Sequence, residues 1–125
     1  MAEQGRKKIL IVDDEESVCV GMREMLNDAG YSAFYATDGK GAIKAMADAE
    51  YSLIFMDMIM PGMSGLETFR KIKEIKSSQT VVLFTGFFKE ADKMIYQGIK
   101  EGMIDVFIRK PFYSDEIINT AKKYA

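Results

Sequence analysis

The sequence predicts a doubly wound α/β fold built on a five-stranded parallel sheet of strand order 2-1-3-4-5. Short runs of apolar residues alternate along the chain with segments in which apolar residues recur every three or four positions. These runs are apolar throughout, which is typical of parallel strands with helices on both faces of the sheet. Right-handed crossovers leave few possible strand orders, and 2-1-3-4-5 is the order we expect for five such units.

Five strands are expected at the apolar runs, each followed by polar or turn-forming residues. They cover residues 8–12, 31–36, 52–57, 80–84 and 105–109. This alternation of five strands with five helices predicts a flavodoxin-like (βα)5 arrangement in one domain, residues 1–125.

Helices are expected between the strands. The first follows Glu15 and ends at Gly30, a position typical of a C-terminal glycine. The second includes Ala42 and Met46, and the last begins near Ser114, a residue type that caps helices. The third should cover residues 65–76 and the fourth about 90–101. Helical spacing in the third turns four residues toward the core: Leu66, Phe69, Ile72 and Ile75.

Composition excludes several classes of protein. Hydrophobic residues make up 48% of the 125 residues and the net charge is −2, so we expect a globular domain without a nucleic-acid surface. No apolar stretch approaches the ~20 residues of a membrane span. Cys19 is the only cysteine and histidine is absent, which removes intramolecular disulfides and histidine-based catalysis. We therefore expect a cytoplasmic protein with no membrane contact.

Polar residues follow four of the five predicted strands. The first strand is followed by Asp13 and Asp14, the third ends at Asp57, the fourth precedes Thr85, and the fifth precedes Lys110. With strand order 2-1-3-4-5, these four strands lie side by side, and their carboxyl ends form the edge where such sheets bind ligands. We therefore expect the five side chains to converge there.

Three carboxylates at one edge repel one another, because two unit charges ~4 Å apart cost roughly 4 kcal/mol at an effective dielectric near 20. Lys110 supplies one compensating charge, and Mg²⁺ is the hard cation that suits this set of oxygen ligands. A carboxylate can also act as a nucleophile and form an acyl phosphate. A metal, a lysine and a hydroxyl supply the charge neutralisation that phosphoryl transfer requires.

These residues resemble the motifs of response-regulator receiver domains in two-component signalling. The motifs are Val12-Asp13-Asp14, the segment 56–65 (MDMIMPGMSG), Thr85-Gly86 and Lys110-Pro111-Phe112, in order and on the expected strand ends. The match extends over residues 8–124.

The resemblance implies a role for each residue of the set. Asp57 would accept a phosphoryl group from a histidine kinase or phosphotransfer protein. Mg²⁺ would bind Asp13, Asp14, Asp57 and the backbone carbonyl of Ile59. The phosphoryl oxygens would bind Thr85 and Lys110. The domain would catalyse only its own phosphorylation and slow dephosphorylation, so it is not an enzyme acting on other substrates.

The resemblance also implies how the domain would switch. Thr85 would move toward the phosphoryl group, and the aromatic side chain of Phe107 would turn inward behind it. A downstream target would then bind the altered surface of the fourth helix, fifth strand and fifth helix. The alternative for Phe107 is a strand residue that is permanently packed inside.

Two features depart from many family members. The stretch from Thr85 to Lys110 is about three residues longer than in many members and begins with Phe87-Phe88, which limits what can be inferred about the partner surface. The positions two after Asp57 and two after Thr85 are Ile59 and Phe87, both apolar. In similar domains these positions flank the path of the hydrolytic water, so we expect a phosphoryl lifetime of many minutes or longer.

Two other classes of function compete with this reading. A flavodoxin-like cofactor binder would need a phosphate-cradling loop after the first strand, whereas Asp13-Asp14-Glu15-Glu16 would repel a phosphate unless a metal intervened. A pseudo-receiver that binds partners without phosphorylation would have a damaged acidic pocket, whereas every residue of that pocket is present here.

Overall fold

The computed structural model describes residues 5–85, 93, 96–97, 99–101, 107–109 and 114–125. The strands are β1 (Lys8–Val12), β2 (Ser32–Ala36), β3 (Leu53–Asp57), β4 (Val81–Thr85) and β5 (Phe107–Arg109). The helices are α1 (Glu16–Asp28), α2 (Gly39–Asp48), α3 (Gly65–Ile75) and α5 (Ser114–Tyr124). Among the helices of these ranges, none combines the length and hydropathy that crossing a membrane would require.

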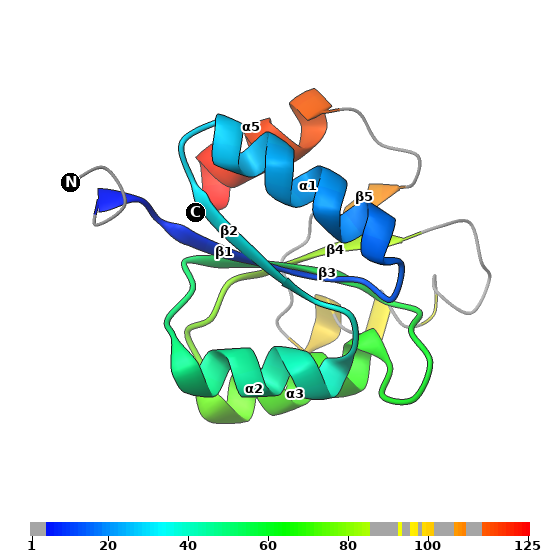
Figure 1. Cartoon of the computed structure of the whole chain (residues 1–125). Coiled ribbons are helices and arrows are strands. Elements are labelled where there is room, and N and C mark those ends of the chain that lie inside the picture. The colour runs from blue at the N-terminus through cyan, green and yellow to red at the C-terminus, as the bar shows by residue number, and fades with distance from the viewer. Residues whose placement is uncertain (1–4, 86–92, 94–95, 98, 102–106, 110–113) are drawn as a thin grey trace.

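The five strands form one parallel sheet in the order β2-β1-β3-β4-β5, which confirms the predicted fold class. Helices α1 and α5 cover one face of the sheet, and α2 and α3 cover the other (Figure 1). The direction in which successive strands are added to the sheet changes at β1, because β2 lies on one side of β1 and β3 lies on the other. In parallel sheets such a switch point opens a crevice at the carboxyl ends of the strands.

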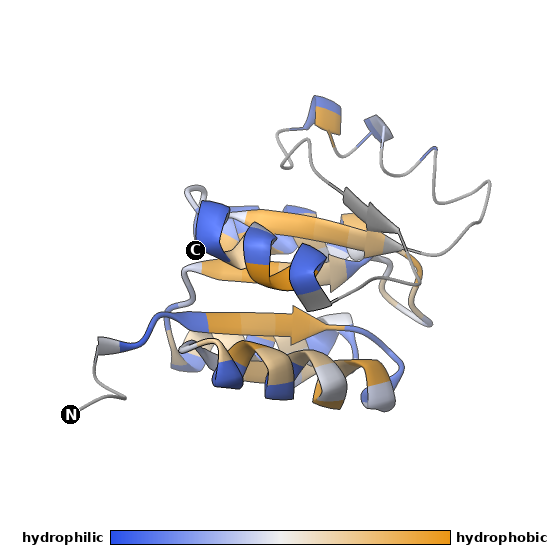
Figure 2. Ribbon diagram, turned by 90° about the horizontal axis from the view of Figure 1, so that it is seen from above, coloured by the Kyte–Doolittle hydropathy of each residue, from blue (hydrophilic) through white to orange (hydrophobic). Residues whose placement is uncertain are grey.

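Each face of the sheet carries its own hydrophobic core. Alternate residues of β1 illustrate this, because Ile9 packs with α1 and α5 residues whereas Leu10 packs with α2 and α3 residues. The central strands are apolar along their length, and the helices are apolar on one side only (Figure 2). Cys19 is fully buried in the core on the α1 and α5 side of the sheet.

Local sequence signals account for several helix ends. Gly30 follows α1 with φ 102°, the left-handed conformation that favours glycine after a helix. The Asp38 carboxylate accepts from the backbone N–H of Gly41 at 2.7 Å at the start of α2. Ser64 Oγ accepts from the N–H of Glu67 at 3.2 Å at the start of α3. These two caps satisfy N–H groups that lack partners within their helices.

Two expectations need comment. Ile75 was expected to face the core but is 52% exposed, because α3 ends at this residue and the chain turns away at Lys76. The fourth predicted helix lies largely outside the described residues, although Lys93, Tyr96, Gln97, Ile99 and Lys100 are helical where the structure describes them.

Candidate acidic site at the carboxyl ends of β1 and β3

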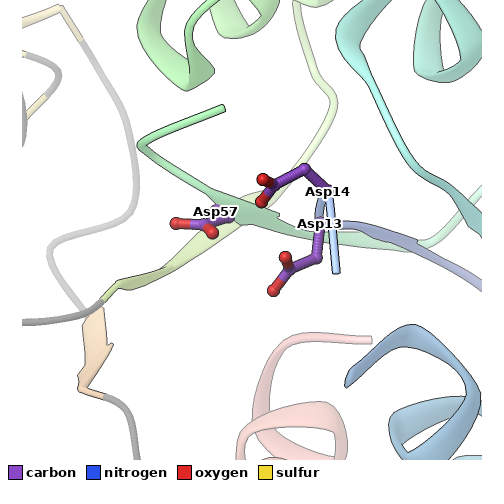
Figure 3. A group of neighbouring side chains, drawn as sticks. All are labelled: Asp13, Asp14 and Asp57. Carbon is purple, nitrogen blue, oxygen red and sulfur yellow. The ribbon is translucent and has the colours of Figure 1, made fainter. Parts of the chain in front are cut away.

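Three aspartates meet at the switch point of the sheet. Asp13 and Asp14 follow directly after β1, and Asp57 is the last residue of β3. The two strands are neighbours, with Val12 paired to Met56, so their carboxyl ends place the acids side by side (Figure 3). One carboxylate oxygen from each of the three lies within 4.8 Å of the others.

The three carboxylates differ in their exposure to solvent. Asp13 is fully buried and Asp57 is only 5% exposed, whereas Asp14 is exposed. Asp13 Oδ1 accepts from the backbone N–H of Glu15 at 2.9 Å, and Asp57 Oδ1 accepts from the N–H of Ile59 at 3.3 Å. These hydrogen bonds fix the orientation of two buried carboxylates, whereas the third, Asp14, is exposed to solvent.

The donor set fits Mg²⁺. Oxygens that bind an octahedral Mg²⁺ at 2.0–2.1 Å lie roughly 3–4 Å from one another. The three carboxylate oxygens of this group lie within 4.8 Å of one another, so only a small movement would bring them to that spacing. Mg²⁺ usually keeps several waters and binds one or two carboxylates directly, so one of the three can act through a water. Anions this close together, two of them buried, also need a cation to offset their repulsion.

The loop after β3 is fixed to the strand by backbone packing. Met58 is buried beside Asp57, and its carbonyl accepts from the N–H of Gly65 at 3.0 Å. A Cβ at Gly65 would stand 2.5 Å from the carbonyl oxygen of Asp57, so only glycine fits without movement. Nothing in the residues that neighbour Gly65 in the sequence signals this close approach.

Ile59 is partly exposed, with 36% of its surface accessible, two residues beyond Asp57. The sequence expectation placed its backbone carbonyl among the metal ligands and its apolar side chain beside the water path. The structure places the residue on the loop at the site, with its N–H on the Asp57 carboxylate.

The other predicted site residues are only partly described. Thr85 ends β4 and pairs with Arg109 of β5, so its backbone lies at the same edge as Asp57, while its side chain is outside the description. Phe107 begins β5 opposite Leu83, again without a described side chain. Lys110, together with 86–88 and 111–112, lies outside the described residues, although it directly follows Arg109 at the end of β5.

Cys19 of α1 contacts the backbone of the acidic site. Its thiol lies 3.3 Å from the carbonyl oxygen of Asp13, to which it donates, and the residue is fully buried. The backbone N–H of Asp13 in turn donates to the carbonyl of Ala36 at 3.2 Å. The turn that presents Asp13 and Asp14 is therefore held by both α1 and β2.

The fold and the site together define a class: a doubly wound α/β domain with an acidic cluster at its switch point. The model of the response regulator receiver domain matches residues 9–122. The chain therefore belongs to the family of response regulator receiver domains, the class of module found in two-component systems.

Similar proteins cover both stand-alone and larger chains. Sporulation initiation phosphotransferase F of Bacillus subtilis is 36% identical over 118 residues, which are 94% of this chain and 93% of that protein. The transcriptional regulatory protein ResD of the same species is 34% identical over 122 residues, or 98% of this chain, but the match spans only 49% of ResD.

Solved receiver domains have the same architecture. The receiver domain of NtrX from Brucella abortus superposes with a TM-score of 0.83 at 30% identity, covering 93% of this chain and 96% of that one. A CheY-like receiver domain protein from Methanospirillum hungatei gives a TM-score of 0.83 at 27% identity, over 94% and 93% of the two chains.

Proposed function

We propose that this domain is a phospho-aspartate switch in which Asp57 is the phosphoacceptor. The observation that carries the proposal is the meeting of Asp57 with Asp13 and Asp14 at the end of β1 and β3, in a chain of the receiver family. Asp57 is 5% exposed and lies beside the exposed Asp14. Phosphoryl donors would approach past the exposed Asp14.

The transfer would convert the carboxylate of Asp57 into an acyl phosphate. A carboxylate oxygen of Asp57 attacks the phosphorus of a phosphohistidine, the N–P bond breaks, and its electron pair returns to the imidazole, which takes up a proton from solvent. Bound Mg²⁺ would supply positive charge to the transferring group. Asp13 and Asp14 would hold the ion, with Asp57 and the carbonyl of Ile59 completing the protein ligands.

Thr85 and Lys110 would contact the phosphoryl oxygens, because phosphorylation increases the negative charge at Asp57. The lysine offsets charge and the threonine hydroxyl donates a hydrogen bond. Drawing Thr85 toward the site would let Phe107 turn inward and change the surface formed by the fourth predicted helix, β5 and α5. The domain would modify only itself, so the proposal gives it no separate substrate.

The donor would be a histidine kinase or a histidine phosphotransfer protein of the cytoplasm. Sporulation initiation phosphotransferase F, whose name denotes phosphoryl transfer, is matched by this chain over 93% of its length, which supports that donor class. A phosphorylation-independent interaction module is the alternative, and it requires that the intact acidic site serve another purpose.

Transfer from a donor protein tests the proposal. A ³²P-labelled histidine phosphotransfer domain is mixed with the chain and with Asp57→Asn, with and without Mg²⁺. Label should move to the wild-type chain only when Mg²⁺ is present, and hydroxylamine should release it because acyl phosphates are cleaved by that nucleophile. Label that appears equally on Asp57→Asn, or label stable to hydroxylamine, would reject Asp57 as the acceptor.

A further inference from the structure

Strand β2 forms an edge of the sheet, with a neighbour on one side only among the described residues (Figure 1). Edge strands expose unpaired backbone groups, and proteins usually protect them with charged residues, proline or a bulge. The sequence of β2 is Ser-Ala-Phe-Tyr-Ala, which has neither a charge nor a proline. This edge therefore lacks the usual devices that prevent pairing with another strand.

The backbone groups on the outer side of β2 can be assigned from the hydrogen bonds on its inner side. The N–H of Ser32 donates to Lys7 at 3.0 Å, and the carbonyl of Ala36 accepts from Asp13 at 3.2 Å, so both residues face β1. Because strand residues alternate, Ala33 and Tyr35 direct their backbone groups outward.

One of these outward groups is already paired, since the N–H of Ala33 donates to Asn27 Oδ1 at 2.8 Å. The carbonyl of Ala33 and both backbone groups of Tyr35 face outward, where none of the described strands lies beside them. Three backbone groups are enough to guide a short extended segment into register, because main-chain hydrogen bonds fix the pairing of an added strand.

An aromatic side chain stands at the centre of this edge. Phe34 is 43% exposed, one of four exposed large hydrophobic residues in the described part of the chain. Its ring is held by an edge-on contact with Tyr51, with centroids 6.2 Å apart, and by the ammonium group of Lys8, 5.9 Å from its centroid. An exposed aromatic ring that already packs against its neighbours can serve as an anchor at a protein interface.

Basic residues outnumber acidic ones in the lining of two hollows near Phe34, although the chain as a whole has a net charge of −2. Arg6 lines two hollows at this end of the sheet. One, of about 470 Å³, runs beside Ser32 and Phe34; the other, of about 510 Å³, also includes Lys8 and Tyr51. Within the described ranges neither Arg6 nor Lys8 forms an ion pair. Glu50 in the second hollow is outnumbered by Arg6, Lys8 and Lys76.

We propose that the outer edge of β2, with Phe34, Arg6 and Lys8, is a docking surface for an extended acidic peptide segment of a partner protein, which pairs with β2 as an added strand. The backbone of β2 gives the register, the ring of Phe34 packs against an apolar side chain, and the two cations select acidic neighbours. The two cations are separate from the acidic site, because Arg6 precedes β1 and Lys8 begins it, whereas Asp13 and Asp14 follow its last residue.

The test is a titration of the ¹⁵N-labelled chain with the acetylated, amidated peptide Asp-Val-Glu-Phe-Glu-Val, followed by amide NMR. We expect a dissociation constant on the order of hundreds of micromolar, with the largest shifts in residues 32–36. A peptide with lysine in place of each acid, and a peptide N-methylated at alternate residues, should each bind at least about fivefold more weakly.

Two pairs of variants separate charge and backbone pairing from folding. Lys8→Glu should weaken binding about fivefold or more, whereas Lys44→Glu, an exposed lysine of α2, should leave it unchanged. Tyr35→Pro removes an outward N–H, as proline can on an edge strand, and should weaken binding relative to Tyr35→Ala. Both Tyr35 variants lose the same hydroxyl bond to Glu16, so their comparison isolates the N–H.

Three results would overturn the proposal. One is the absence of shifts in residues 32–36 up to about 2 mM peptide, the weakest binding that remains specific at such concentrations. Another is equal binding of the N-methylated peptide. The third is self-association of the free chain through β2 in sedimentation experiments, which would make a second copy the occupant in place of an acidic peptide.

Discussion

Gly65 lies directly against the backbone of Asp57. A Cβ at Gly65 would stand 2.5 Å from the Asp57 carbonyl oxygen and 2.6 Å from Met58 Cα. The N–H of Gly65 also donates to the Met58 carbonyl at 3.0 Å. The first residue of α3 is thus docked on the end of β3, so the position of the helix and that of the proposed phosphoacceptor are linked.

Gly65→Ala should therefore destabilise the domain and disturb the site. The methyl group must displace the end of β3, which costs about 1–3 kcal/mol, as for other overpacked positions. Urea denaturation measures the loss. Gly21→Ala is the matched control, because nothing lies within 4 Å of a Cβ at this helical position and the change should stabilise α1 by up to about 1 kcal/mol. Equal effects of the two substitutions would contradict the close approach.

A bidentate ion pair joins α3 to the helical segment that ends near Glu101. Arg70 donates to both carboxylate oxygens of Glu101 at 2.7 Å, and Gln97 donates to one of them at 2.8 Å. The hydrogen bonds from Arg70 first, and then from Gln97, lower the pKa of Glu101 to about 2. Arg70→Ala should raise this pKa toward 4.5, whereas Lys71→Ala should not.

The sign of the pH effect follows from that depressed pKa. The folded state holds Glu101 ionised, so the stabilisation is complete above its ordinary value of 4.5 and is lost as the pH falls toward about 2. Carbon-detected NMR titration of the Glu101 carboxyl in the wild type and in Arg70→Ala measures both curves. Superimposable curves would show that the ion pair does not persist in solution.

Mg²⁺ should stabilise the domain through the acidic site. At a concentration roughly ten times its dissociation constant, the ion adds about 1.4 kcal/mol, which should raise Tm by about 4 °C. Asp13→Asn removes one of the three facing charges, so it should raise Tm without Mg²⁺ and abolish most of the Mg²⁺ effect. Glu24→Gln, on the exposed side of α1, should retain it. A Mg²⁺ shift that persists in Asp13→Asn would place the ion elsewhere.

Ile59 should slow hydrolysis of the phosphoryl group. Its apolar side chain, 36% exposed beside Asp57, offers no hydrogen bond to an attacking water. Ile59→Asn supplies one and should accelerate dephosphorylation about tenfold, equivalent to roughly 1.4 kcal/mol in the barrier. The decay of purified phosphoprotein in Mg²⁺ buffer gives the rate. Ile75→Asn is the control, because Ile75 is an exposed isoleucine at the far end of α3.

Most of the fold could be predicted from the sequence, because strand and helix periods alternate without interruption from Lys8 to Ile75. The aspartate cluster was equally predictable, since Asp13, Asp14 and Asp57 each follow an apolar run and parallel strands align their carboxyl ends. The sequence pattern could not predict that Asp13 is buried and Asp14 exposed, because adjacent side chains in a turn can point in either direction.

Contacts between distant segments were outside the reach of periodicity. The Arg70–Glu101 pair spans 31 positions and depends on where the helical segment packs. The constraint on Gly65 depends on how closely α3 approaches β3, which is a distance that the sequence does not encode locally. The prediction for Ile75 was wrong, because helical spacing predicted that it faces the core although the helix ends at this residue.

Intact-mass spectrometry after incubation with acetyl phosphate tests the central claim most directly. The wild-type chain should gain one phosphoryl group only when Mg²⁺ is present, and Asp57→Asn should gain none. Asp38→Asn, which alters a carboxylate that caps α2, should still be modified. A chain that gains no phosphoryl group, or an adduct that survives in Asp57→Asn, would contradict a phospho-aspartate switch at Asp57.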